Sequence, residues 1–164
     1  MNIVLAGMPG SGKTTISQTL AKKLGCAVLD TDALIVEEHG AIPEIFSRYG
    51  EDRFRELETE AVKKACGFDG AVIATGGGCL MRERNVLLFR KNGKIIYLRA
   101  AVPTLVSRLE GDTSRPLLAG GTEKRLKELF AARAEIYEKT ADFSVDTDNL
   151  APEEVAEKIL ELIK

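Results

Sequence analysis

The sequence predicts an α/β protein in which helices cover both faces of a parallel β-sheet. Short apolar runs alternate with longer amphipathic stretches along the chain, and this alternation is typical of strands joined by helical crossovers. A glycine-rich loop joins the first apolar run to the first amphipathic stretch. The chain has 164 residues, of which 45% are hydrophobic and 29% are charged. This length and composition are those of one globular domain, so we expect residues 1–164 to form a single domain.

The expected strands are five short apolar runs, because a strand that is buried on both faces carries apolar residues continuously. They lie at residues 3–6, 27–29, 71–74, 94–98 and 143–145. Helical periodicity is found between them, at residues 13–24, 32–39, 43–66, 82–91, 102–110 and 122–140. A last helix is expected from Pro152 onward, because proline suits the first turn and the two glutamates after it complement the helix dipole.

Two segments do not fit a simple alternation of strands and helices. Residues 31–66 hold two or three helices between the second and third expected strands, which is more than a crossover needs. Residues 110–121 form a polar loop that contains glycine and proline and lies between two helices. This loop is either an ordinary surface loop or a lid that closes over a ligand, since long loops in compact domains are often functional.

Charge and cysteine content exclude several classes of function. The formal net charge is −2, so the chain has no general positive field for nucleic acid or for an anionic membrane. Cys26, Cys66 and Cys79 are widely spaced and form no C-x-x-C pair, which indicates free thiols in a reducing compartment and no zinc site. No segment has the pattern of a signal peptide or of a membrane span. We therefore expect a cytoplasmic protein.

The strongest motif is a phosphate-binding loop. Residues 7–14 read GMPGSGKT, which matches G-x-x-x-x-G-K-T, and they stand between an expected strand and an expected helix. The glycines let backbone N–H groups turn toward phosphate oxygens, and the helix dipole adds to the attraction. Lys13 would reach the outer phosphates, and the Thr14 hydroxyl would bind Mg²⁺. The alternative is a chance glycine turn before a helix, but the strand, the lysine and the threonine all stand in the required places.

The loop by itself identifies a nucleotide-binding protein but not its reaction. A GTPase switch would carry an Asn-Lys-x-Asp motif and an Asp-x-x-Gly after a later strand, and the sequence has neither. A motor ATPase would normally be a larger protein. A small chain with a helical insert and a lid fits a small-molecule kinase better.

Two carboxylates, Asp30 and Asp32, follow the second expected strand. Asp30 stands where the apolar run ends, and it would hold the metal ion through water. Asp32 projects further and would orient an acceptor hydroxyl and accept its proton. A structural role is also open, because an Asp or Thr at this point would serve as a helix N-cap.

Two arginines stand among residues that are expected to be buried. Arg133 lies on the apolar stripe of its helix, and Arg55 lies beside the apolar stripe of another. Each would bind a carboxylate if it points into a cleft. Each also has a structural alternative, in which Arg133 extends its aliphatic stem past the core and Arg55 pairs with Glu58 or Thr59.

Three consecutive glycines, Gly76, Gly77 and Gly78, follow the third expected strand. One glycine would serve a turn, whereas three remove every side chain from the point where the strand ends. Bare backbone there would let a ligand approach closely and would offer N–H groups to its oxygen atoms. The alternative is a glycine-rich turn into the helix at 82–91.

Taken together, these motifs resemble the shikimate kinases, a family of P-loop small-molecule kinases related to the nucleoside monophosphate kinases. The segments that carry the resemblance cover nearly the whole chain: GMPGSGKTT, LDTDALI, HGAIPEIFSRYGEDRFRELE, TGGG, TSRPLLAG, AARAEIYEK and VDTDNL. The resemblance implies a P-loop three-layer sandwich with a five-stranded parallel sheet in the order 2-3-1-4-5. It also implies a substrate-binding insert at about 31–66 and a lid at about 110–121.

The same resemblance implies a reaction and the residues that carry it. ATP, with Mg²⁺, would phosphorylate the 3-hydroxyl of shikimate in the pathway to chorismate and the aromatic amino acids. Catalysis would depend on Lys13, Asp32 and Arg115. ATP would contact Gly10, Ser11, Gly12, Lys13, Thr14, Thr15, Arg108, Arg115 and Asn149. Shikimate would contact Asp32, Arg55, Gly76, Gly77, Gly78 and Arg133, and the metal ion would contact Thr14 and, through water, Asp30.

The expected partners are therefore two small molecules, ATP and shikimate, and we expect a monomer that binds neither nucleic acid nor membrane. Two alternatives stay open at the level of the sequence. The first is a kinase of the same shape that acts on another acid, such as gluconate. The second is a catalytically silent ATP-binding regulator.

Overall fold

The structure is a computed structural model that describes residues 1–110 and 121–164. Its centre is a five-stranded sheet in the order β2-β3-β1-β4-β5, in which every pair of neighbouring strands is parallel. The strands are β1 (Asn2–Ala6), β2 (Val28–Asp30), β3 (Val72–Ala74), β4 (Gly93–Arg99) and β5 (Phe143–Asp146). The expected sheet order is confirmed, and each strand lies within one residue of the range that its apolar run predicted.

Seven α-helices are found within the described residues, together with a short 3-10 turn. They are α1 (Lys13–Leu24), α2 (Thr31–His39), α3 (Ile42–Cys66), α4 (Glu83–Lys91), α5 (Val102–Glu110), α6 (Thr122–Thr140) and α7 (Pro152–Leu162), and the turn is η1 (Cys79–Met81). The expected helices are confirmed, whereas the sequence did not predict η1. Residues 111–120, which make up nearly all of the expected lid and include Arg115, lie outside the described residues.

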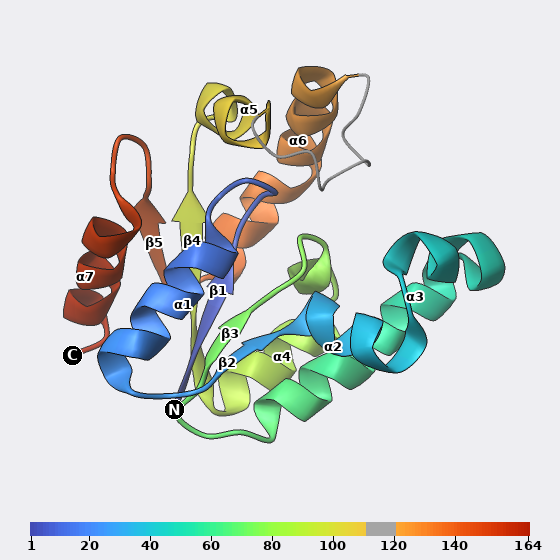
Figure 1. Cartoon of the computed structure of the whole chain (residues 1–164), viewed down its shortest axis with the longest axis horizontal. Helices are drawn as coiled ribbons and strands as arrows, with labels where there is room; N and C mark the ends of the chain where they lie inside the picture. The colour runs from blue at the N-terminus through green and yellow to red at the C-terminus, as the bar shows by residue number, and fades with distance from the viewer. Residues whose placement is uncertain (111–120) are drawn as a thin grey trace.

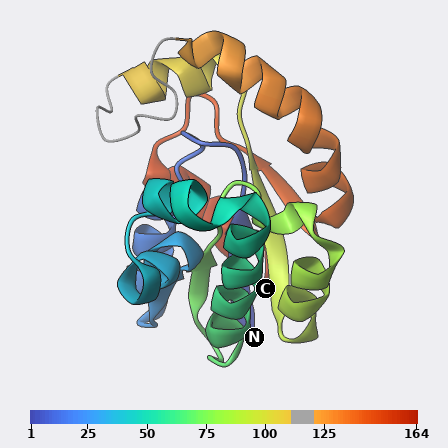
Figure 2. The ribbon, with the colours of Figure 1, turned by 90° about the vertical axis from the view of Figure 1, so that its right-hand side faces the viewer.

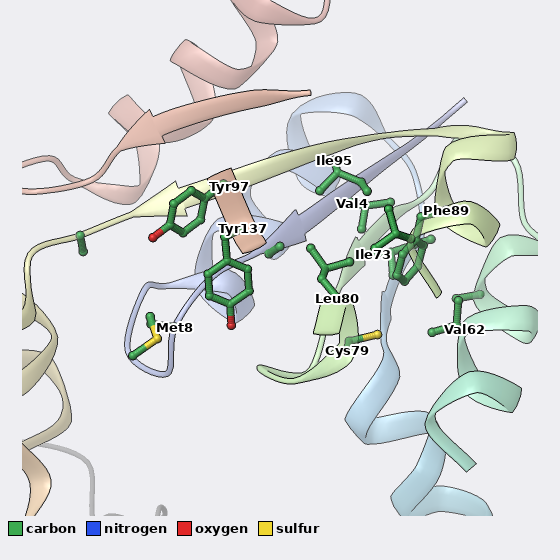
Figure 3. Packing of buried hydrophobic residues seen from close by; sticks show 14 of the residues in the cluster. Val4, Met8, Val62, Ile73, Cys79, Leu80, Phe89, Ile95, Tyr97 and Tyr137 are labelled. Atoms are coloured by element: carbon green, nitrogen blue, oxygen red, sulfur yellow. The ribbon is translucent and has the colours of Figure 1, made fainter. Parts of the chain in front are cut away.

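Helices cover both faces of the sheet (Figure 1). On one face, Ile3 and Leu5 of β1 pack in a cluster with apolar residues of α1 and α7. On the other face, Val4 and Ala6 pack in a cluster with residues of α3, α4 and α6 (Figure 3). Figure 2 shows this second face, with α3 and α4 side by side and α6 crossing beside them. The strict alternation along β1 follows from the pleat of a strand that is buried on both faces.

The insert expected at residues 31–66 is made of α2 and α3. The helical conformation of α3 breaks at Gly50, where φ is 80° and ψ is 174°, so the helix expected at 43–66 is bent into two parts. This value of φ favours glycine, because a Cβ would be strained there. The insert has a small core of its own, formed by Ile35, Ile45, Phe54, Leu57 and Ala61. It extends beyond the edge strand β2, as Figure 1 shows.

The carboxyl ends of the parallel strands meet at one edge of the sheet, which is where α/β proteins bind ligands. The loop at residues 7–14 follows β1, and the glycine turn at residues 76–78 follows the neighbouring strand β3. Thr75 fixes the two strand ends together, because its backbone N–H and its hydroxyl both donate to the carbonyl of Leu5, at 3.1 and 2.9 Å. The topology therefore brings the candidate residues to a single edge.

The cysteines and the helices bear on two expectations from the sequence. Cys26, Cys66 and Cys79 are free thiols, as the sequence predicted. Within residues 1–110 and 121–164, no helix combines the length and the apolar character that crossing a membrane requires.

Candidate functional site

The loop at residues 7–14 joins the buried strand β1 to the N-terminus of α1. Gly10 and Gly12 have positive φ, at 83° and 93°, and Gly12 is the N-cap of α1. A Cβ at Gly7 would lie 2.8 Å from both the Leu98 carbonyl oxygen and the Ser11 hydroxyl, so this position also requires glycine. The loop borders a cavity of about 340 Å³ at the N-terminus of the helix. Such a terminus attracts anions through its unpaired N–H groups and its dipole.

Two side chains of the loop have donors that suit phosphate oxygens. The Ser11 hydroxyl is buried and has no hydrogen-bond partner in the described part of the chain. A buried hydroxyl without a partner is costly, so a ligand that accepts a hydrogen bond from it would be stabilised here. The Lys13 ammonium group donates to the carbonyls of Gly7 and Met8, both of which belong to the same loop. Lys13 is therefore already held at the cavity wall.

Arg108 of α5 also lines this cavity. Its guanidinium donates to the carbonyl of Gly10 at 3.2 Å and to the carbonyl of Thr147 at 3.0 Å. It thus connects the phosphate loop to the turn after β5. Leu150 of that turn and Pro152, the first residue of α7, also line the cavity. Seven of the expected ATP contacts are brought together: Gly10, Ser11, Gly12, Lys13, Thr14, Thr15 and Arg108. The exposed Asn149 belongs to the same turn but is not among the lining residues.

The two aspartates at the end of β2 and the start of α2, Asp30 and Asp32, have different positions. Asp30 is the N-cap of α2, and its carboxylate accepts a hydrogen bond of 3.0 Å from the N–H of Ala33. The capping role that the sequence left open is therefore carried by Asp30. Asp32 lies in the first turn of α2, and its carboxylate faces Gly76. Of the two carboxylates, Asp32 is the one directed at the glycine turn.

Each of the three glycines faces one charged side chain at contact distance. A Cβ would lie 2.5 Å from Asp32 Oδ1 if added at Gly76, 2.7 Å from Arg133 Nη1 at Gly77 and 2.5 Å from Arg55 Nη1 at Gly78. None of the three glycines has a positive φ, so their backbone conformations would accept other residues. Glycine is thus required for space and not for conformation. The sequence predicted that the missing side chains leave room for a ligand. In the structure, the space that a Cβ of each glycine would need is occupied by a charged side chain of the protein itself.

Arg55 is held by two glutamates of its own helix. Glu58 is 1% exposed and accepts a hydrogen bond of 3.0 Å from Arg55, and the exposed Glu51 lies 3.6 Å away. Burial raises the pKa of Glu58, and the positive charge of Arg55 opposes this shift without cancelling it. The structural pairing that the sequence left open for Arg55 is therefore real. It does not exclude a role in binding, because the guanidinium also faces Gly78.

A second cavity lies beside the glycine turn. Its volume is about 470 Å³, and Arg55, Gly78, Arg82 and Arg133 contribute to its wall. The wall also includes the Glu51 carboxylate, but three cations against one carboxylate leave a net positive charge that favours an anionic ligand. A Cβ at Gly77 would also lie 4.0 Å from Cδ of Pro9, so the glycine turn adjoins the phosphate loop. The site therefore offers an anion-binding region next to a phosphate-binding region.

Three further residues contribute to this site that the sequence did not predict. Thr31 is buried and its hydroxyl accepts the N–H of Gly76 at 2.9 Å, Tyr137 donates to the carbonyl of Gly77, and Arg82 lines the second cavity. A signal was present for Tyr137, because a tyrosine on a buried stripe normally finds a hydrogen-bond partner for its hydroxyl. Nothing local to Arg82 distinguishes it from Arg84, which is exposed.

The donors available to a metal ion are few. Within the described residues, no group of three or more His, Cys, Asp or Glu side chains is arranged to hold one. Thr14 lines the first cavity at the start of α1, and Asp30 has one carboxylate oxygen engaged in capping. This set suits Mg²⁺ that arrives with a nucleotide, because Mg²⁺ usually keeps its waters and takes only one or two protein ligands.

Comparison with known proteins gives consistent matches along nearly the whole chain. Residues 9–164 match the family model described as Shikimate kinase. The chain is 47% identical to a shikimate kinase of Thermodesulfovibrio yellowstonii over 161 residues, which cover 97% of this chain and 92% of the relative. It is 45% identical to a shikimate kinase of Geobacter sulfurreducens over 165 residues, with coverage of 99% and 91%. The solved structure of a shikimate kinase from Acinetobacter baumannii in complex with shikimate has a TM-score of 0.91 and 36% identity, with coverage of 99% and 92%.

The burial of Glu58 leads to a prediction about stability and pH. A carboxyl whose pKa is raised in the folded state binds more protons folded than unfolded between the two pKa values, so stability falls as pH rises through that window. We expect Glu58→Gln to raise the melting temperature at about pH 8 by about 2–4 °C, the shift that 1 kcal/mol produces in a chain of this size. The gain should shrink toward about pH 4, and thermal unfolding at several pH values measures it.

Glu51→Gln is the matched control, because Glu51 pairs with the same arginine but its side chain is 67% exposed. It should change the melting temperature little at any pH, since exposed ion pairs contribute little to stability. An equal gain for both variants, or a gain for Glu58→Gln that does not depend on pH, would contradict burial as the cause.

Proposed function

This chain belongs to the shikimate kinase family of ATP-dependent phosphotransferases, and from this premise we propose how its residues divide the transfer of the ATP γ-phosphoryl group to the 3-hydroxyl of shikimate. The observation that carries the proposal is the convergence of Asp32, Arg55 and Arg133 on three successive glycines beside the phosphate loop. One carboxylate and two guanidinium groups suit an acceptor that has both hydroxyl groups and a carboxylate.

The phosphate loop would bind ATP and stabilise the transferring group. The N–H groups of the loop and the Ser11 hydroxyl would donate to phosphate oxygens, and the Lys13 ammonium group would exchange its carbonyl contacts for the outer phosphates. Mg²⁺ bound with the nucleotide at Thr14 would neutralise phosphate charge. Arg108 would hold the nucleoside end of the cavity through its bonds to Gly10 and Thr147.

The glycine turn would hold the acceptor. Asp32 lies against Gly76, where its carboxylate would orient the reacting hydroxyl and accept its proton. Arg55 and Arg133 lie against the two following glycines and would bind the carboxylate of shikimate. A guanidinium suits this role because it can offer two parallel N–H bonds to a carboxylate. Positioning of both substrates next to each other accounts for much of the rate in this class of reaction.

The direct test of this function is an ADP-release assay with Mg²⁺-ATP. We expect rapid release only when shikimate is added, and little release with gluconate or without an acceptor. Lys13→Met should lower kcat by on the order of 10²-fold or more, because the charge on the transferring group would lose its main side-chain cation. Equal release with gluconate would indicate another acceptor, and no release with any acceptor would indicate a silent ATP-binding protein.

The contact at Gly76 leads to a second prediction. Gly76→Ala should displace the Asp32 carboxylate and lower kcat by roughly 10–100-fold, because small misplacements of a catalytic group are costly. The melting temperature should change little, since φ at this position accepts alanine and the atom met is the end of a flexible side chain. Kinetics and thermal unfolding of the same preparation measure both effects.

A double variant with Asp32→Asn tests whether Gly76→Ala lowers kcat through Asp32. If Gly76→Ala acts through Asp32, combining it with Asp32→Asn should lower kcat hardly further than Asp32→Asn alone. Fully additive losses would show that the two positions act independently.

A third prediction concerns the carboxylate of the acceptor. Arg133→Ala should raise KM for shikimate by an amount equivalent to about 2–5 kcal/mol, and Arg133→Lys by less, because lysine keeps the charge but loses the forked pair. A shikimate analogue without the carboxylate should bind poorly to the wild type and be insensitive to Arg133→Ala.

Arg125→Ala is the control on the same helix, because Arg125 is exposed and pairs with Glu128 at 3.5 Å. It should leave KM for shikimate unchanged. If Arg133→Ala instead lowers the melting temperature and leaves KM unchanged, Arg133 serves the packing of α6 and not the binding of the acid.

A further inference from the structure

The buried hydroxyl of Tyr137 makes a contact that the roles proposed above do not use. Tyr137 is 1% exposed, and its hydroxyl donates to the carbonyl oxygen of Gly77 at 2.5 Å. Its ring packs against the ring of Tyr97 in β4, with centroids 5.1 Å apart. Figure 3 shows the two rings side by side with their hydroxyl groups pointing in different directions. Tyr137 therefore connects α6 to the glycine turn.

The glycine turn needs such a connection because glycine has the greatest conformational freedom of all residues. Two of its three carbonyls are held from within the turn: Gly76 accepts from the N–H of Cys79 at 3.0 Å, and Gly78 accepts from the N–H of Met81 at 3.1 Å. The carbonyl between them, that of Gly77, is held by Tyr137, which lies 60 positions away in the sequence. The middle peptide of the turn thus depends on a residue of another element.

The same bond also affects groups that face the acceptor. The carbonyl of Gly77 and the N–H of Gly78 belong to one planar peptide, so fixing the carbonyl fixes the direction of the N–H. Gly77 also faces Nη1 of Arg133, which stands one helical turn from Tyr137 on α6. The position of the turn relative to Arg133 is therefore set in part by Tyr137.

The protonation state of Tyr137 is compatible with this contact over a wide range of pH. Burial raises the pKa of Tyr137 to about 12, while the charge of Arg133 and a side-chain hydrogen bond with it act in the opposite direction. The hydroxyl consequently keeps its proton and stays a donor to Gly77 throughout the physiological range.

We propose that Tyr137 is a positioning residue for the acid substrate: its hydroxyl fixes the peptide between Gly77 and Gly78 against Arg133. The proposal rests on the proposed function, in which this turn and Arg133 hold shikimate. It assigns to Tyr137 an effect on shikimate binding and none on ATP binding, because the described residues that line the ATP cavity belong to other elements.

Tyr97→Phe provides a matched control for Tyr137→Phe. Both tyrosines are 1% exposed and share one apolar cluster, but no hydrogen bond of the Tyr97 hydroxyl is found within residues 1–110 and 121–164. Each substitution removes one oxygen atom and keeps the packed ring. A difference between the two variants therefore reports the hydrogen bonds of the Tyr137 hydroxyl, to Gly77 and with Arg133, and not the packing of the ring.

The experiment compares both variants with the wild-type chain in KM for shikimate, KM for ATP, kcat and melting temperature. We expect Tyr137→Phe to raise KM for shikimate by about 3- to 10-fold, the effect of one net hydrogen bond, with KM for ATP unchanged. Tyr97→Phe should leave both KM values unchanged. Amide hydrogen exchange at Gly77 and Gly78 should become faster in Tyr137→Phe only, because the middle peptide loses its restraint.

The proposal is overturned if the two variants have the same KM for shikimate and the same exchange at Gly77 and Gly78. It is also overturned if Tyr137→Phe raises both KM values equally or only lowers the melting temperature. Failure of the proposed function would look different, because the wild type would then release no ADP with shikimate. In that case the exchange measurement, which needs no substrate, still decides whether Tyr137 restrains the turn.

Discussion

The absence of side-chain volume at residues 76–78 is the constraint on which the rest of the site depends. Three elements that are distant in sequence, α2, α3 and α6, each direct one charged group at this turn, and a Cβ there would lie within 2.5–2.7 Å of those groups. The conformation of the turn does not itself require glycine, since φ is not positive at any of the three positions. The glycines are therefore required because they have no side chain. They let a carboxylate and two guanidinium groups approach one short stretch of backbone at the end of β3.

Charge compensation makes this crowding tolerable in a chain whose net charge is −2. Arg55 has the buried Glu58 and the exposed Glu51 as ion-pair partners. Arg133 has a hydrogen bond with the neutral Tyr137 hydroxyl, which occupies a donor without compensating the charge. Transfer of a charged carboxylate from water to the protein interior is costly, and the raised pKa of Glu58 reflects that cost. Because of these contacts, the cations at the second cavity are partly ordered before a ligand binds. Ligand binding therefore costs less side-chain conformational entropy.

Local patterns were sufficient to predict most of the fold. Apolar runs bounded by turns located all five strands to within one residue, because a strand buried on both faces permits few polar residues. The spacing of glycines, lysine and threonine located the phosphate loop, because backbone geometry near a helix N-terminus has narrow requirements. The break in α3 at Gly50 was not predicted, since a glycine inside a helical pattern is compatible with a straight helix as well as a kink.

The sequence by itself determined the fold class and the phosphate loop. Through the family resemblance it also predicted the three charged residues that face the glycine turn, but it did not predict Arg82. Only the tertiary structure decided which alternative each residue follows: Asp30 caps α2, Asp32 reaches the glycine turn, and Arg55 both pairs with Glu58 and faces Gly78. The same residue types serve capping, ion pairing and binding, so local pattern cannot separate these roles. Their positions depend on how helices far apart in the chain pack against one sheet edge. The bond from Tyr137 to Gly77 has the same origin, because it joins residues that only the packing of α6 brings together.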